Sequence, residues 1–155
     1  MFDRQAAINY AEKYAFNYNP DFYDFTEIGG DCTNFVSQCL FYGGIKMDYS
    51  PLGWYYISLS DRAPAWTGVN EFYSFGIKNK RTGFTLRSCL SSELDIADVI
   101  QLGDGNTYFH MLLVSKVVVT DGVRQILVAA HDNDVFNAPL SNYAFKTIRY
   151  LKVSD

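Results

Sequence analysis

The chain has 155 residues, of which 48% are hydrophobic and 17% aromatic, and its formal net charge is −4. That length predicts a single domain, residues 1–155, that can bury a core without disulfides or metals, and the aromatic content excludes a disordered protein. The mild acidity and the lack of a Lys/Arg run argue against a nucleic-acid partner.

The N-terminal stretch Met1–Tyr10 has no basic segment followed by an apolar one, so we expect no signal peptide. No segment approaches the roughly 18 consecutive apolar residues that a membrane-spanning helix needs. The chain is therefore expected to be either intracellular or a mature or excised domain, and to have no membrane span.

Two helices are predicted in the first third of the chain. Asp3 is a suitable N-cap for a helix that extends to about Asn17, and Asp31 is a suitable N-cap for a helix over Cys32–Tyr42. The second helix should end at Gly43-Gly44. An aromatic loop lies between the two helices.

The second half of the chain changes to the alternating pattern of strands. Residues 46–64 are predicted to be irregular, with an exposed run at 54–56, and a third helix is predicted over about 65–75. Strands are predicted over 84–86, 99–101, 108–119, 125–130 and 147–153, with a hairpin turn at 120–122. This order predicts an α+β fold in which N-terminal helices pack on an antiparallel sheet.

The cysteines do not form a disulfide framework. If both are helical, Cys32 and Cys39 lie about 10 Å apart along the helix, beyond the separation of about 7 Å that a disulfide spans. Cys32 begins its helix, where the helix dipole stabilises a thiolate, so it is a candidate nucleophile as well as a candidate core residue. Cys39 and Cys89 are expected in the core.

The two histidines lie on adjacent predicted strands. His110 is within an apolar strand, and His131 ends the next one. Counting outward from Asp121 in the hairpin turn places these histidines near each other. A helix-terminal Cys facing a strand His that a further polar group orients is the arrangement of Cys–His nucleophilic catalysis.

The run Gly30-Asp31-Cys32-Thr33-Asn34-Phe35-Val36-Ser37-Gln38-Cys39-Leu40 resembles the signature of the bacterial putative amidase domain family. That family is similar to the NlpC-type and CHAP cell-wall hydrolases within the papain-like cysteine peptidase fold. The helix at residues 4–15, the strand at 97–101 and the segments around the two histidines extend the resemblance to nearly the whole chain.

The resemblance implies Cys32 as the nucleophile and His110 as the base. His131 is the implied third residue, as in NlpC-type enzymes, with Asp132 and Asn133 as alternatives. The stretch 24–28 lacks the Gln that supplies the oxyanion hole in papain-like proteases, so the Cys32 backbone N–H is the expected donor. Further residues expected at the oxyanion or substrate-binding part of the site are Tyr23, Asp31 and Trp54.

These features predict a cysteine amidase or peptidase that cleaves the stem peptide or the sugar–peptide amide of peptidoglycan at the bacterial wall. The alternative is a catalytically inactive wall-binding module of the same fold. A third possibility is a zinc site formed by Cys32, His110 and His131. The amidase needs no cofactor or metal, has peptidoglycan or a peptide as its only expected partner, and is expected to be a monomer.

Overall fold

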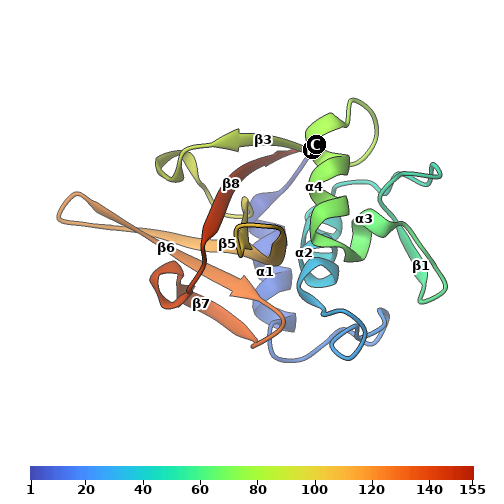
Figure 1. Ribbon diagram of the computed structural model, residues 1–155, viewed down its shortest axis with the longest axis horizontal. Helices are drawn as coiled ribbons and strands as arrows, with labels where there is room; N and C mark the ends of the chain where they lie inside the picture. Colours follow the sequence, from blue (N-terminus) through green and yellow to red (C-terminus); the bar gives the residue numbers. More distant parts are fainter.

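A computed structural model describes all residues 1–155 and has an α+β architecture. Figure 1 shows the helices on one side of a twisted sheet, from which a long hairpin of β5 and β6 projects. The helices are α1 (Arg4–Tyr14), α2 (Cys32–Tyr42), α3 (Pro64–Thr67) and α4 (Val69–Lys78), with short 3-10 helices at Ser91–Glu93 and Leu140–Asn142. No helix is both long enough and apolar enough to cross a bilayer.

The main sheet has six strands in the order β3-β8-β4-β5-β6-β7, and every neighbouring pair is antiparallel. A separate pair, β1 and β2, forms a small hairpin. The strands are β1 (Tyr56–Ser58), β2 (Asp61–Arg62), β3 (Thr85–Cys89), β4 (Val99–Gly103), β5 (Tyr108–Thr120), β6 (Val123–Ala130), β7 (Val135–Pro139) and β8 (Thr147–Ser154).

The first two predicted helices form as their sequences indicate. The Asp3 side chain accepts a hydrogen bond from the Ala6 backbone N–H, which caps α1, although this helix ends at Tyr14 rather than near Asn17. Helix α2 spans the predicted residues and ends at Gly43. Its nearly uninterrupted burial follows from its position between α1, α3 and the sheet.

The prediction of one continuous third helix over about 65–75 is wrong. The helix is broken at Gly68, where the backbone is extended, into α3 and α4. A Cβ at Gly68 would displace the flexible Glu71 carboxylate and would lie 3.1 Å from the Pro64 carbonyl oxygen, a tight contact with the backbone of α3. The expected irregular stretch also contains β1 and β2, and β7 is a strand that the sequence pattern did not indicate.

The hairpin turn at Asp121-Gly122 is confirmed. Both residues have positive φ, 52° and 76°, as a tight two-residue turn between twisted strands requires. Further along the hairpin, Val114 pairs with Val128 and Lys116 with Leu127, so Ser115 is an extra residue in β5. This bulge shifts the register of the sheet end that carries the candidate site.

The core lies on both faces of the sheet. The larger hydrophobic cluster joins the helices to one face, and Phe35, Val36 and Leu40 of α2 contribute to it. A smaller cluster, with Leu102, Leu112 and Val128 among its members, covers the other face. Helix α2 is therefore held against the sheet along its buried side, which fixes its N-terminus beside the ends of β5 and β6.

Candidate active site

Cys32 is the first residue of α2, as predicted, and its approach depends on Gly30. Gly30 has a φ of 97°, and a Cβ there would lie 2.5 Å from Oδ2 of Asp132. A larger residue at this position would therefore meet both backbone strain and a steric clash. Because Gly30 has no side chain, the backbone can pass close to the 131–134 turn, which places Cys32 beside that turn.

The N-terminus of α2 is capped by Asp132, a residue 100 positions away in sequence. Its carboxylate accepts hydrogen bonds from the backbone N–H of Asp31, at 2.9 and 3.0 Å, and from that of Cys32, at 3.3 Å. Asp31 occupies the N-cap position but its side chain makes no capping bond. The negative charge of Asp132 thus lies at the positive end of the helix dipole.

Asp132 is presented by a turn with unusual backbone geometry. Asp132 and Asn133 have φ values of 63° and 68°, and both are residue types that tolerate the left-handed region better than most. Asn133 is exposed. Left-handed non-glycine residues of this kind concentrate at functional sites.

His110 lies near the start of β5, opposite Leu102 of β4, and is partly buried. Its ring lies 5.9 Å from the ring of Tyr143 and makes no hydrogen bond to another protein group. Burial lowers the pKa of His110 below its ordinary value, while Asp132 acts in the opposite direction. The ring is consequently neutral and able to accept a proton near neutral pH.

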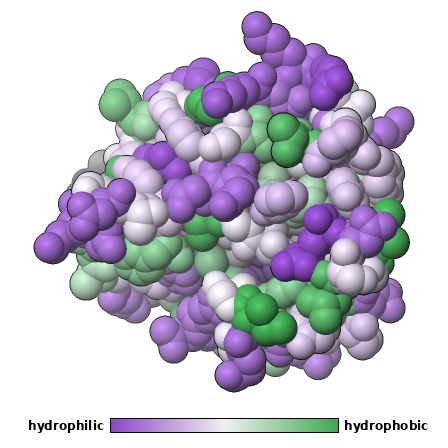
Figure 2. All heavy atoms as spheres, turned by 45° about the vertical axis from the view of Figure 1, so that its right-hand side comes forward, coloured by the Kyte–Doolittle hydropathy of each residue, from purple (hydrophilic) through white to green (hydrophobic).

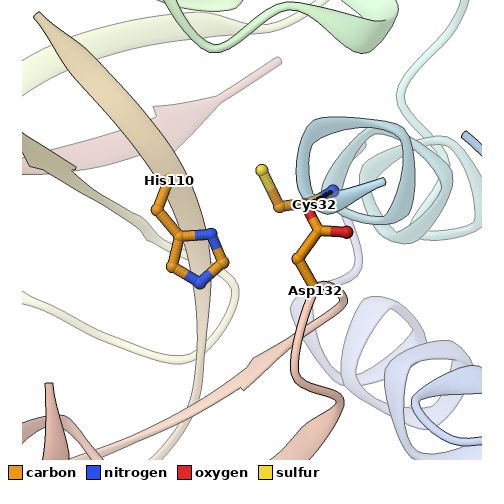
Figure 3. A group of neighbouring side chains, drawn as sticks. All are labelled: Cys32, His110 and Asp132. Carbon is orange, nitrogen blue, oxygen red and sulfur yellow. Dashed lines mark hydrogen bonds between the residues drawn. The ribbon is translucent and has the colours of Figure 1, made fainter. Parts of the chain in front are cut away.

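Cys32, His110 and Asp132 form one cluster (Figure 3). The thiol sulfur, a ring nitrogen and a carboxylate oxygen all lie within 4.8 Å of one another. The three residues come from the start of α2, from β5 and from the turn after β6. This cluster combines a potential nucleophile, a potential base and a carboxylate.

The expected lowering of the Cys32 pKa by the helix dipole is not what the structure indicates. Burial of the thiol, followed by the nearby Asp132 carboxylate, raises the pKa of Cys32 to about 11. Cys32 is only 5% exposed. In this arrangement Cys32 is a neutral thiol at physiological pH, so it needs a base when it reacts.

His131, which sequence reasoning placed third in the site, lies away from the thiol. Nδ1 contacts the buried carboxylate of Asp31, Nε2 contacts the Tyr14 carbonyl oxygen, and the ring is stacked between Tyr18 and Phe35. Both ring nitrogens are thus used by protein groups. The structure brings Asp132, the alternative third residue, into the cluster in place of His131.

The predicted oxyanion and substrate-binding residues are distributed differently from expectation. Trp54 is fully buried, and its indole N–H donates to Ser37 Oγ, so the prediction that it lies in an exposed loop is wrong. Tyr23 is 40% exposed, and its carbonyl oxygen accepts a hydrogen bond from the Asn34 side chain near the start of α2. The Cys32 backbone N–H points at Asp132 rather than at open space.

Asp31 holds the loop before α2 rather than facing outward. Its buried carboxylate accepts hydrogen bonds from the backbone N–H of Phe25 and from Nδ2 of Asn34, in addition to its contact with His131. The dipeptides Asp31-Cys32 and His131-Asp132 therefore hold each other in place. The Asp31 carboxylate contacts the His131 ring, and the Asp132 carboxylate accepts hydrogen bonds from the backbone N–H groups of Asp31 and Cys32. In the sequence, the Asp/Asn-rich segment 132–134 was the feature that could have indicated this contact.

The cluster also has the chemistry of a metal site. A thiolate, an imidazole and a carboxylate are all ligands of Zn²⁺, and a water molecule could complete a tetrahedral arrangement around the ion. The carboxylate that completes this set is Asp132, whereas the sequence-based zinc hypothesis used His131. Deprotonation of Cys32 would accompany metal binding.

The chain combines an α+β fold with a Cys–His–Asp cluster at the start of a helix. Residues 1–153 match the putative amidase domain family, and the chain belongs to that family, which confirms the resemblance seen in the sequence. The family name indicates a hydrolase of amide bonds.

One similar protein is the uncharacterized protein YhbB of Bacillus subtilis (strain 168), which is 33% identical over 123 residues. The match covers 75% of this chain and 38% of that protein, so the chain spans well under half the length of this relative. No solved structure matches.

Proposed function

We propose that the chain is a cysteine-dependent amidase or peptidase in which Cys32 is the nucleophile and His110 the general base. The observation that carries this proposal is the approach of the thiol sulfur, the His110 ring and the Asp132 carboxylate to within 4.8 Å of one another. Membership of the putative amidase domain family supports the same class of reaction. The position of the thiol at a helix start and of the base on a neighbouring strand is similar to the papain-like arrangement.

The raised pKa of Cys32 favours proton transfer during attack over a preformed thiolate. His110 accepts the Sγ proton while the sulfur bonds to the amide carbon and the carbonyl oxygen takes the electron pair. Collapse of this intermediate breaks the C–N bond, and His110 returns the proton to the leaving amine. Water then attacks the thioester, again with His110 as base, and releases the acid and the free thiol.

Asp132 has two proposed roles in this reaction. Its charge stabilises the imidazolium that forms when His110 takes the proton, as the acidic member of a Cys–His–Asp set does. Its carboxylate also accepts a hydrogen bond from the Cys32 backbone N–H, which is the group best placed to stabilise an oxyanion. Substrate binding would therefore shift Asp132 toward His110 and release this N–H for the carbonyl oxygen.

The substrate we propose is peptidoglycan, cleaved at a stem-peptide bond or at the sugar–peptide amide. This follows from the resemblance to NlpC-type and CHAP cell-wall hydrolases. The test is digestion of purified sacculi followed by mass spectrometry of the released fragments, which identifies the broken bond. Cys32→Ala should release nothing, whereas Cys89→Ala, at a half-buried thiol remote from the cluster, should match the wild type.

Hydrolysis by Cys32→Ala at the wild-type rate would overturn the proposal. Binding of sacculi by the wild-type protein without release of any fragment would instead identify the chain as a wall-binding module. Both outcomes can be read from one experiment if bound protein and soluble fragments are measured in the same samples.

Metal binding is a second candidate function, favoured by the Cys32, His110 and Asp132 donor set. Stoichiometric zinc in protein purified without chelator or affinity resin, lost in Asp132→Ala, would support it. In the amidase proposal, added Zn²⁺ should instead inhibit hydrolysis reversibly, because the ion would hold the Cys32 thiolate and the His110 nitrogen.

A further inference from the structure

A cavity lies apart from the Cys32 cluster, between α4 and the 52–53 turn. Its volume is about 600 Å³, within the usual range of small-ligand sites. None of Cys32, His110 or Asp132 lines it. Figure 2, which turns the right-hand side of Figure 1 forward, shows hydrophilic side chains around separate apolar patches rather than one continuous apolar surface.

The cavity has an apolar part and a cationic part. Leu52, Ala65 and Phe75 supply the apolar surface, and Leu52 is 85% exposed although its side chain is large. Lys78, Lys80 and Arg81 supply three positive charges.

These three cations have no acidic partner in the protein. The ion pairs of the chain use Arg4, Arg87, Lys152 and the N-terminus, and none uses a cation of the cavity. Glu71 also lines the cavity, but its carboxylate is folded toward Gly68 at the N-terminal end of α4. It lies seven residues before Lys78, about 10 Å along the helix, so it leaves the cationic end uncompensated.

The segment that carries Lys80 and Arg81 is held in place. The Asn79 side-chain amide donates to the carbonyl oxygens of Arg81, Thr82 and Phe84, and its Oδ1 accepts from the Arg81 backbone N–H. The backbone that carries two of the cations is thereby ordered before any ligand binds, which reduces the entropy that binding costs.

We propose that this cavity binds a short acidic peptide, whose carboxylates contact Lys78, Lys80 and Arg81 and whose apolar side chain contacts Leu52 and Phe75. Charge complementarity identifies the ligand: the protein as a whole carries −4 and repels acidic peptides, while this end of α4 attracts them. The proposal does not depend on hydrolysis by Cys32, so it can be tested in Cys32→Ala protein.

The test measures fluorescence anisotropy of a labelled Glu-Leu-Glu-Glu peptide against the matched Gln-Leu-Gln-Gln peptide. The acidic peptide should bind about tenfold or more tightly than its amide counterpart, and the difference should shrink as salt is added. In Lys78→Glu/Lys80→Glu/Arg81→Glu this preference should be lost. Ser74→Phe, which places an aromatic ring in the cavity, should weaken binding without changing the net charge.

The control is Lys13→Glu/Lys46→Glu/Lys116→Glu, which has the same net charge but alters cations outside the cavity. It should retain the preference to within about threefold. Equal loss in both triple variants would mean that long-range charge alone governs binding, and equal affinity of the wild type for the two peptides would mean that no acidic-peptide site exists. Either result overturns the proposal. All the altered side chains are exposed, and circular dichroism checks that each variant is folded.

Discussion

The ring of His131 and the carboxylate of Asp31 form a buried pair, with Nδ1 and Oδ2 2.5 Å apart, directly behind the residues that carry the candidate site. Their chain neighbours, Asp132 and Cys32, make the contact that faces the site. The two histidines of the chain therefore have different proposed roles. His131 positions the turn that presents Asp132, and His110 exchanges protons.

We expect His131→Ala to destabilise the fold. The substitution leaves the buried Asp31 carboxyl without its hydrogen-bond partner and removes a ring stacked between Tyr18 and Phe35; an orphaned buried polar group alone typically costs about 1–3 kcal/mol. That is a large part of the roughly 5–15 kcal/mol by which a domain is stable. Urea unfolding followed by tryptophan fluorescence measures the loss.

His110→Ala is the matched comparison for that experiment. The His110 side chain is partly exposed and has no hydrogen-bond partner in the protein, so its removal should change the unfolding free energy by less than about 1 kcal/mol. Hydrolysis should nonetheless be lost. Equal destabilisation by the two substitutions would contradict the separate roles proposed for the histidines.

Asp132→Asn should make the Cys32 thiol more reactive toward iodoacetamide. The Asp132 charge contributes to the raised pKa of Cys32, so its removal lowers that pKa and increases the thiolate fraction at a given pH. A gain of about 3- to 10-fold in alkylation rate near neutral pH corresponds to a pKa change of up to about one unit. Amide hydrolysis should fall in the same variant, because the imidazolium loses its stabilising charge.

Asp132→Ala separates charge from helix capping. Asn retains an oxygen that can accept the N–H groups of Asp31 and Cys32, whereas Ala removes every acceptor and should cost about 1 kcal/mol more stability. If Asp132→Asn left the alkylation rate unchanged, the charge of the Asp132 carboxylate would not contribute to the raised pKa of the Cys32 thiol.

Local signals were sufficient for the elements that place Cys32. A Gly-Gly-Asp approach and an apolar periodicity indicated where α2 begins, and Asp121-Gly122 indicated the hairpin that joins the two strands of the site. These features depend on backbone preferences within a few residues. The structure and the family match agree with them.

The third residue of the site depended on register, which local preferences do not determine. The regular pairing beside the turn, such as Thr120 with Val123, would extend to set His110 opposite Asn133. The bulge at Ser115 moves the partner of His110 by one residue to Asp132, as extending the Leu113–Ala129 pair by three residues shows. Neither register sets His131 opposite His110, and because adjacent residues project in different directions, an offset of one residue changes which side chain faces the site. Counting from a turn cannot detect a bulge six residues away from it.

The burial of Trp54 also could not be predicted from the residues next to it in the sequence. Pro51 and Gly53 precede it, so the local pattern predicted an irregular surface loop, but Trp66 and Phe84 from distant segments pack against its ring. We expect Trp54→Phe to cost about 1–3 kcal/mol, because Ser37 Oγ loses the indole donor inside the core. Tyr55→Phe, which loses only an exposed contact with Asp61, should be nearly neutral. KM for the amide substrate should not change in either variant.

The final prediction concerns the pH dependence of two reactions at Cys32. In a Cys89→Ala background, alkylation by iodoacetamide reports the Cys32 thiolate, because Cys39 is fully buried. Since burial and Asp132 raise the pKa of Cys32 to about 11, the alkylation rate should increase with pH up to that value. A freely exposed thiol would level off near its ordinary pKa of about 8.5.

Amide hydrolysis should follow a different curve. Burial lowers the pKa of His110, and a base with a lowered pKa is already neutral at more acidic pH, so hydrolysis should reach its plateau below the ordinary histidine range. Between that point and pH 9, alkylation should rise while hydrolysis stays level. If hydrolysis rose in parallel with alkylation, the free thiolate would be the attacking species and His110 would not act as the base. In His110→Ala any residual hydrolysis should lose its plateau and follow the alkylation curve, because only the thiolate can then attack.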